Sequence, residues 1–354
     1  MALTLSHGGD TTFTSSSPDN EILIGTKEGI VRIARDQGGA AWRVADRWLT
    51  DKHIHALIIE PSSGAIVAGA TQDAVFVSED GGGTWERRDN GLIETDVYSL
   101  AASRINGTSR IYAGTEPAHL FCSDDLGRNW SELPALRKVD MSAWTFPAPP
   151  HLAHTKHINF DPTDPNTLFV SIEQGGLLKS TDGGETFTII SGMDDDVHRT
   201  AIDPTNPDQI YLTGGDGTYV TADGGATWEH RTDTKHEIGG YPDFVLVNPK
   251  NTDTIFITAA ETQPGEWGER GTTGSRISKS VDRGKTWTQL RNGLPDRLKP
   301  SFQAVILEDW GASFSIFGAT VTGEVWASED GGENWAEIVT GLPPISKGMH
   351  YALL

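Results

Sequence analysis

The chain has 354 residues, with 28 Lys or Arg against 49 Asp or Glu, so its formal net charge is −21 at pH 7. That charge disfavours nucleic acid and anionic membrane surfaces, which bind basic patches. No apolar run approaches the ~20 residues of a membrane-spanning helix, and the first residues do not look like a signal peptide. A single cysteine, Cys122, excludes an intrachain disulfide. We therefore expect a cytoplasmic protein with no nucleic-acid or membrane partner.

An eight-residue motif recurs along the chain with the pattern Ser/Thr-x-Asp-x-Gly-x-Thr/Asn-Trp/Phe. Its six copies occupy residues 78–85, 123–130, 180–187, 221–228, 280–287 and 328–335, and a decayed copy lies at 35–42. The hydroxyl and the Asp can bond the amides of their own turn, and the aromatic side chain can fill the space between sheets. The motif therefore predicts a repeated structural turn rather than a catalytic group.

This motif resembles the Asp-box, or bacterial neuraminidase repeat, of sialidases, sortilin ectodomains, xyloglucanases and a photosystem II assembly factor. In those families the box lies on the hairpin between the third and fourth strands of a β-propeller blade, away from the active site. The resemblance implies an all-β propeller here. A sialidase is disfavoured, because the Phe/Tyr-Arg-Ile-Pro motif of that family is missing and the nearest run is 31–34, Val-Arg-Ile-Ala.

A second repeat, an apolar strand that ends in an acidic or amide turn, predicts the innermost strand of each blade. Its copies begin at residues 55, 98, 156, 198, 243 and 303, and the C-terminal run 350–354 is a seventh. The stretch 21–46 holds three strand-like runs but no inner strand. We therefore predict one seven-bladed β-propeller over residues 1–354, in which 20–47 and 349–354 share the closing blade. Rim insertions are expected near 137–155 and 261–275.

The inner strands should line a central channel, so their first residues are candidates for chemistry. Histidine occupies three of the seven places. Neutral imidazoles beside carboxylates suit a divalent transition metal such as Zn, Mn, Fe or Cu. The expected metal ligands are His55, His198 and His350. The residues expected to act in catalysis are Lys156, Tyr98, Asp243 and the rim acid Glu173.

The main functional hypothesis is a metal-assisted hydrolase or lyase that acts on a small-molecule or carbohydrate-like substrate at the channel mouth. The residues expected to bind that substrate are Gln303, Arg199, Glu261, Trp267 and Trp144. Two alternatives remain open. One is a glycosidase, other than a sialidase, with paired rim carboxylates. The other is a non-catalytic platform for a protein or ligand, in which the channel histidines are hydrogen-bonded lining.

Overall fold

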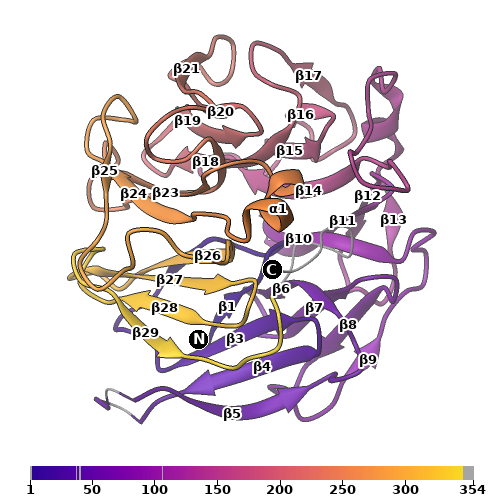
Figure 1. Cartoon of the computed structure of the whole chain (residues 1–354). Coiled ribbons are helices and arrows are strands. Elements are labelled where there is room, and N and C mark those ends of the chain that lie inside the picture. The colour runs from indigo at the N-terminus through magenta and orange to yellow at the C-terminus, as the bar shows by residue number, and fades with distance from the viewer. Residues whose placement is uncertain (1, 37, 40, 106, 346–354) are drawn as a thin grey trace.

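The computed structural model describes residues 2–345 apart from 37, 40 and 106. Seven sheets surround one axis, so the predicted all-β, seven-bladed propeller is confirmed (Figure 1). Helical structure is limited to two short 3-10 turns and one α-helical turn in these residues. They are Pro134–Lys138, Pro264–Glu266 and α1 (Trp267–Arg270).

The blades are numbered here in chain order, and their strands run from the axis outward. Blade one holds β1 (Leu3–Leu5), β3 (Glu21–Thr26), β4 (Gly29–Ala34) and β5 (Arg43–Trp48). Blade two holds β6 (Ile54–Ile59), β7 (Ile66–Ala70), β8 (Val75–Ser78) and β9 (Glu86–Arg87). Blade three holds β10 (Asp96–Ile105), β11 (Thr108–Glu116), β12 (Leu120–Ser123) and β13 (Ser131–Glu132). Blade four holds β14 (His154–Phe160), β15 (Leu168–Glu173), β16 (Gly176–Ser180) and β17 (Thr188–Ile190).

The remaining three blades follow the same order. Blade five holds β18 (Val197–Asp203), β19 (Asn206–Gly214), β20 (Gly217–Thr221) and β21 (Glu229–Thr232). Blade six holds β22 (Tyr241–Val247), β23 (Ile255–Ala260), β24 (Arg276–Ser280) and β25 (Thr288–Gln289). Blade seven holds β26 (Phe302–Asp309), β27 (Phe314–Thr320), β28 (Val325–Ser328) and β29 (Ala336–Val339), with β2 (Thr12–Thr14) added at its inner edge.

The repeated motif forms the same turn between the third and fourth strands in blades two to seven. In blade four, Ser180 Oγ donates to Asp182 Oδ1 and accepts from the Gly184 amide, at 2.8 and 2.9 Å. Asp182 also accepts from the amide and the hydroxyl of Thr186, at 2.9 and 2.6 Å. Gly184 has φ +97°, a conformation that other residues adopt only with strain. These local bonds are those expected from the sequence.

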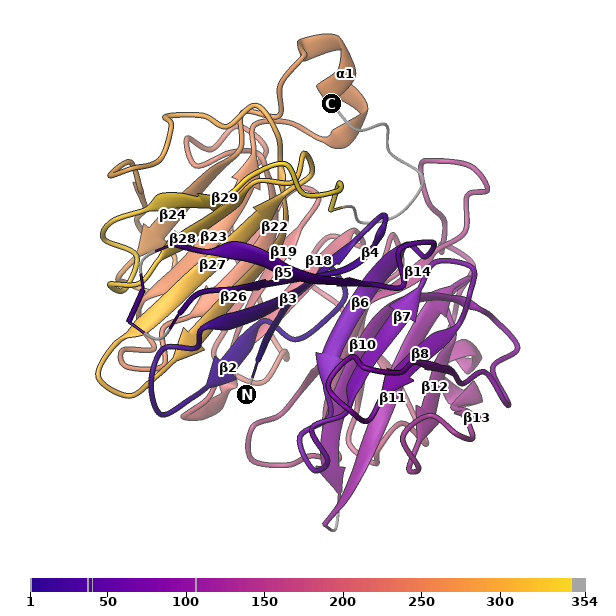
Figure 2. The ribbon, with the colours of Figure 1, turned by 90° about the horizontal axis from the view of Figure 1, so that it is seen from below.

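The closing blade differs from the prediction. Its inner strand is β1, which pairs in parallel with β3 through Leu3 and Ile22. The predicted closing segment 349–354 lies outside the described residues. A run of only three strand residues carries too little alternation to be recognised as an inner strand. The N-terminus also reaches the last blade, because β2 pairs in parallel with β26 (Figure 2). The chain therefore ties blade one to blade seven with its own beginning.

Between β1 and β2, residues 6–11 cross the central channel. The Gly8 amide donates to His55 O at 3.0 Å, and the Leu100 amide donates to Gly8 O at 2.9 Å. The Leu307 amide donates to Thr11 O at 2.8 Å. This segment thus bridges the inner strands of blades two, three and seven. The middle of the channel is filled by the protein's own main chain.

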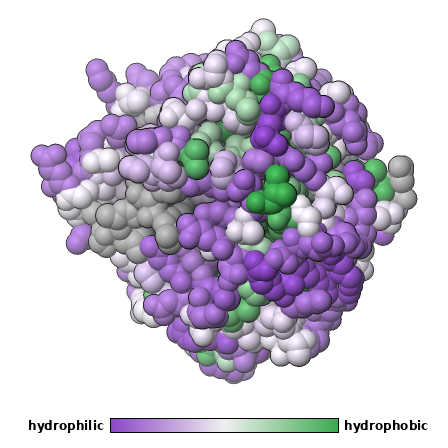
Figure 3. Space-filling model, turned by 90° about the vertical axis from the view of Figure 1, so that its right-hand side faces the viewer, coloured by the Kyte–Doolittle hydropathy of each residue, from purple (hydrophilic) through white to green (hydrophobic). Residues whose placement is uncertain are grey.

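One side of the molecule has a polar surface (Figure 3). The face in Figure 3 is largely hydrophilic, with small scattered apolar spots. In the part of the chain that is described, no helix is long and apolar enough to cross a membrane.

Candidate functional site at the channel mouth

A β-bulge recurs at one position in the inner strands of blades two to seven. The residues it inserts are His55, Tyr98, Lys156, His198, Asp243 and Gln303. A bulge leaves one residue out of the ladder and re-aims its side chain. All six residues are between 0 and 8 % exposed. The predicted equivalence of these positions is confirmed for the described blades, whereas His350 lies outside the described residues.

Three of the residues expected to act in catalysis form one buried charged network. Glu173 Oε2, at the end of β15, lies 2.9 Å from both His154 Nε2 and Lys156 Nζ. Lys156 Nζ is also 3.5 Å from Asp243 Oδ1, and His154 Nδ1 is 3.4 Å from Glu116 Oε2. Two donors on one oxygen stabilise the negative charge of Glu173. The fourth expected residue, Tyr98, stacks on this network from blade three, with its ring centroid 3.8 Å from that of His154.

His198 completes a second polar group beside Glu173. Its Nδ1 lies 2.6 Å from Pro242 O, so this nitrogen must carry the hydrogen. Its other ring nitrogen, Nε2, lies 3.5 Å from Asp196 Oδ1 and makes no hydrogen bond within the described residues. One ligand atom each from Glu173, Asp196 and His198 lie within 4.8 Å of one another. Of the described residues, this is the one group of three potential metal-ligating side chains.

His55 lies in a different environment from His198. Its ring centroid is 4.0 Å from that of Tyr98 and 5.1 Å from that of His7. Burial is the main cause that holds the pKa of His55 well below its usual value, so this imidazole is neutral at pH 7. The structure thus brings His198 together with Glu173 and Asp196, whereas His55 packs against aromatic rings.

A pocket of about 330 Å³ opens over the second group. Glu173, Gln174, Asp196 and Tyr241 line it, together with 146–148 and 263–265 from the two rim insertions. Parts of both segments expected to be rim insertions, 146–148 and 263–265, therefore line this one pocket. We call this cavity the mouth pocket.

The residues expected to bind substrate do not line the mouth pocket. Arg199 is fully buried, with its guanidinium carbon 4.0 Å from the Phe244 ring centroid and Nη2 donating to His7 O. Gln303 is also buried, and its Nε2 donates to Ser301 Oγ at 2.6 Å. The N-terminal segment fills the space in which both side chains would have met a substrate.

The other three expected substrate residues hold the rim loops. Trp267 is 7 % exposed and donates to Thr262 O at 2.8 Å, so it anchors the inserted segment. Trp144 is half-buried against the apolar cluster of blades three and four. Glu261 pairs with Arg297 at 2.9 Å and also contacts Arg270.

Sequence reasoning gave too little weight to Asp196. A run of three aspartates, 194–196, ends two residues before His198, and that spacing was the available signal. Short acidic runs are usually solvated loops, so the run alone did not mark a site.

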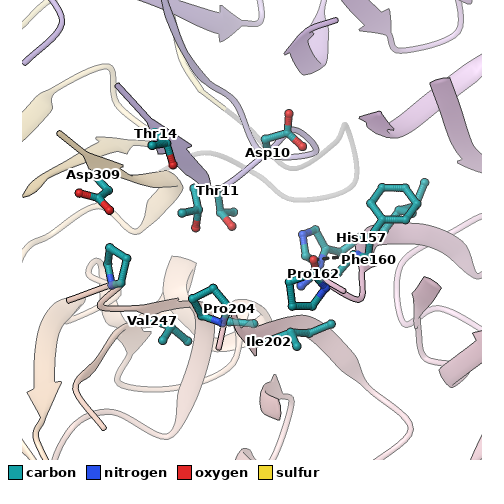
Figure 4. Close-up of a pocket in the computed structure, with 15 residues that line it drawn as sticks. Asp10, Thr11, Thr14, His157, Phe160, Pro162, Ile202, Pro204, Val247 and Asp309 are labelled. Carbon is teal, nitrogen blue, oxygen red and sulfur yellow. Dashed lines mark hydrogen bonds between the residues drawn. The ribbon is translucent and has the colours of Figure 1, made fainter. Parts of the chain in front are cut away.

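A second pocket, of about 270 Å³, opens at the opposite end of the channel (Figure 4). Asp10, Thr11 and Thr14 of the N-terminal segment face His157, Ile202 and Pro204 across it. Burial raises the pKa of Asp10 to about 7. Along β18, Arg199 comes between His198, in the group at the mouth, and Ile202, at this second pocket. The filled middle of the channel therefore separates the two cavities.

The chain is similar in sequence to a sortilin family model and to two xyloglucanases. Residues 175–299, less than half of the chain, match the Sortilin-Vps10 family model (Sortilin, neurotensin receptor 3). The chain is 29 % identical over 157 residues to a probable oligoxyloglucan-reducing end-specific xyloglucanase of Neosartorya fischeri, covering 40 % of this chain and 17 % of the relative. It is 27 % identical over 203 residues to an oligoxyloglucan-reducing end-specific xyloglucanase of Emericella nidulans, covering 51 % and 23 %.

Solved structures agree on the fold. The GH74 xyloglucanase from Xanthomonas campestris matches 96 % of this chain and 55 % of its own, with 17 % identity and a TM-score of 0.70. YCF48 bound to D1 peptide matches 93 % of this chain and 88 % of its own, with 15 % identity and a TM-score of 0.54. The resemblance to these propellers is confirmed. The chain spans less than a quarter of the two xyloglucanases matched by sequence, at 17 % and 23 %.

Proposed function

We propose that the chain hydrolyses glycosidic bonds at the mouth pocket, with Glu173 and Asp196 as its two carboxylates. One observation carries the proposal. The two acids come from blade four and from the start of blade five, line the same pocket, and have oxygens within 4.8 Å of each other. Similarity to xyloglucanases supports a carbohydrate substrate.

The spacing favours a mechanism with retention of configuration. Carboxyl groups about 5–5.5 Å apart are typical of retaining glycosidases, whereas inverting enzymes leave about 6.5–9.5 Å for a water. Glu173, held negative by Lys156 and His154, attacks the anomeric carbon as the glycosidic C–O bond breaks. Asp196, as the carboxylic acid, gives its proton to the leaving oxygen. Water then cleaves the glycosyl–Glu173 ester and returns a proton to the Asp196 carboxylate.

Release of reducing ends from xyloglucan oligosaccharides and other β-glucans tests this mechanism. Glu173→Gln and Asp196→Asn should each lower the rate at least about 100-fold, the usual scale for losing such a group. Asp216→Asn, a rim acid of blade five that bonds Tyr219 at 2.7 Å, is the matched control and should leave the rate unchanged.

Azide distinguishes the nucleophile, Glu173, from the acid, Asp196. It should rescue Glu173→Ala as a glycosyl azide product, because a small anion replaces the missing nucleophile. Folded wild-type protein that hydrolyses none of these glycosides would contradict the proposal and favour the platform alternative.

A second candidate function, metal-assisted hydrolysis, is favoured by the geometry of His198. An imidazole that bonds a carbonyl through one nitrogen and presents the other to carboxylates resembles a metal ligand with its orienting partner. Glu173, Asp196 and His198 would then replace the expected set of His55, His198 and His350. One imidazole and two carboxylates suit Zn, Mn or Fe, and a metal held there would supply a hydroxide nucleophile.

Chelation distinguishes the two mechanisms. Hydrolysis that persists after EDTA treatment supports the carboxylate pair. Hydrolysis that is lost with EDTA and restored by Zn²⁺ or Mn²⁺ supports the metal. In the second case, elemental analysis should find about one metal per chain, and none in His198→Gln.

A further inference from the structure

A third cavity lies on the outer rim of blade six, away from the channel. It has a volume of about 430 Å³, and its lining includes three arginines, Arg276, Arg291 and Arg297, beside two acids, Glu237 and Asp296. It shares no lining residue with the mouth pocket, which 263–265 of the inserted segment line, whereas Arg276 follows that segment in the chain. We call this cavity the rim pocket.

Arg276 is a buried cation that forms no ion pair within 4.0 Å among the described residues, although the charge of Glu261 acts on it from further away. It is 5 % exposed, its Nη1 donates to Glu237 O at 2.6 Å, and its Nε donates to Gly274 O at 3.4 Å. Both acceptors are neutral main-chain carbonyls. A buried charge with only neutral partners is costly, because it has lost water without gaining a counter-ion. Burial lowers the pKa of Arg276, the charge of Arg297 lowers it further, and the charge of Glu261 opposes this in part.

The other two arginines are exposed and lightly held. Arg297 pairs with Glu261 at 2.9 Å, and its side chain is 55 % exposed. Arg291 pairs with Asp296 at 2.5 Å, and its side chain is 59 % exposed. Exposed ion pairs of this kind contribute little to stability, so both guanidiniums can turn toward a ligand at little cost. Arg276 is held by its two main-chain carbonyl acceptors and lines the cavity.

We propose that the rim pocket binds the oxyanion of a ligand, seated on Arg276 and enclosed by Arg291 and Arg297. A guanidinium pairs with carboxylate or phosphate through two parallel hydrogen bonds. Trp287 adds a flat aromatic surface to the lining, on which a sugar ring can lie. The identity of the ligand rests on the proposed function: if the substrate is a carbohydrate, the oxyanion is the carboxylate of an acidic sugar in that substrate. Free phosphate is the other source of the same chemistry.

Calorimetric titration of the full chain with D-glucuronate, inorganic phosphate and D-glucose tests the proposal. Glucuronate should bind and glucose should not. Arg276→Gln should weaken glucuronate binding at least tenfold. Arg297→Gln should weaken it several-fold, and this exposed variant provides the test if Arg276→Gln does not fold. Arg283→Gln, an exposed arginine of blade six that pairs with Asp253, is the matched control and should bind as wild type does.

Each outcome has one meaning. If phosphate binds, glucuronate does not, and Arg276→Gln weakens phosphate binding, the oxyanion pocket is supported. The assignment of its ligand as an acidic sugar is then overturned. Equal binding of glucose and glucuronate, or a folded Arg276→Gln that binds as wild type does, overturns the pocket. Glucuronate binding should persist in Glu173→Gln, so failure of the proposed hydrolysis and failure of this pocket are distinguishable.

Discussion

Replacing Gly8 with alanine tests whether the N-terminal segment is packed inside the ring. A Cβ at position 8 would lie 2.0 Å from Tyr98 O and 3.1 Å from Ala56 Cβ. These atoms belong to the inner strands β10 and β6, whose main chains are held by their own ladders. The contact can be relieved only if the segment moves out of the channel or if the two strands separate.

The expected cost follows from the contacts that are lost. Overpacking a dense interior costs about 1–3 kcal/mol. Gly8 also makes two main-chain hydrogen bonds, to His55 and Leu100, and each contributes about 0.5–1.5 kcal/mol. Because a shift of the segment relieves the clash while it breaks these bonds, the two costs are not fully additive. We expect Gly8→Ala to lower the free energy of unfolding by about 2–4 kcal/mol.

Urea unfolding followed by tryptophan fluorescence measures this change. Gly268→Ala is the matched control, because a Cβ there meets no atom within 4 Å and the residue does not have positive φ. The control should be unchanged, or more stable by up to about 1 kcal/mol through the unfolded state. Equal unfolding midpoints for Gly8→Ala and the wild type would refute the placement of residues 6–11 in the channel.

Three further predictions concern stability and reactivity. Asp182→Ala removes the acceptor of three hydrogen bonds in an exposed turn and should cost about 1–2 kcal/mol in urea unfolding, with hydrolysis per folded molecule unchanged. The raised pKa of Asp10, about 7, means that the folded state binds its proton more tightly than the unfolded state. The free energy of unfolding should therefore fall as pH rises from about 4 to about 7 and then level off, a slope that Asp10→Asn should remove. Burial raises the pKa of the Cys122 thiol, so iodoacetamide at pH 8 should modify it slowly until urea unfolds the chain.

The blade count and the ring of channel residues could be predicted because both rest on repetition. Each blade repeats one turn motif and one inner strand, so an alignment of the copies places His55, Lys156 and His198 at equivalent positions from the amino-acid sequence alone. The bulge that makes them equivalent has no sequence pattern of its own. It shows only in the register shifts of six ladders.

The closing strand and the filled channel could not be predicted, because they depend on contacts between distant segments. Leu3–Leu5 is too short to show alternation, and parallel pairing needs no turn signal next to it. Equivalent blade positions led us to expect His55 and His198 to share a metal. His7 instead packs between His55 and Phe244, with ring centroids 5.1 and 5.7 Å away. Equivalent positions in the sequence predict that these side chains point toward the channel axis, but they do not predict which other residues occupy the channel.

The N-terminal segment also explains where the candidate site lies. An open channel would let water reach the buried charges from both ends. With His7 and Arg199 in its middle, the channel has a floor, and the mouth pocket is a closed-ended cavity above it. The two rim insertions belong to the start of blade four and to blade six, so they enclose the edge between blades four and five that carries Glu173 and Asp196. The floor closes the inner end of the cavity, and the Glu173 side chain is only 1 % exposed, so little water reaches its carboxylate and the electrostatic interactions around it are strengthened. Loosening the floor with Gly8→Ala should therefore lower hydrolysis in molecules that remain folded, although residue 8 does not line the mouth pocket.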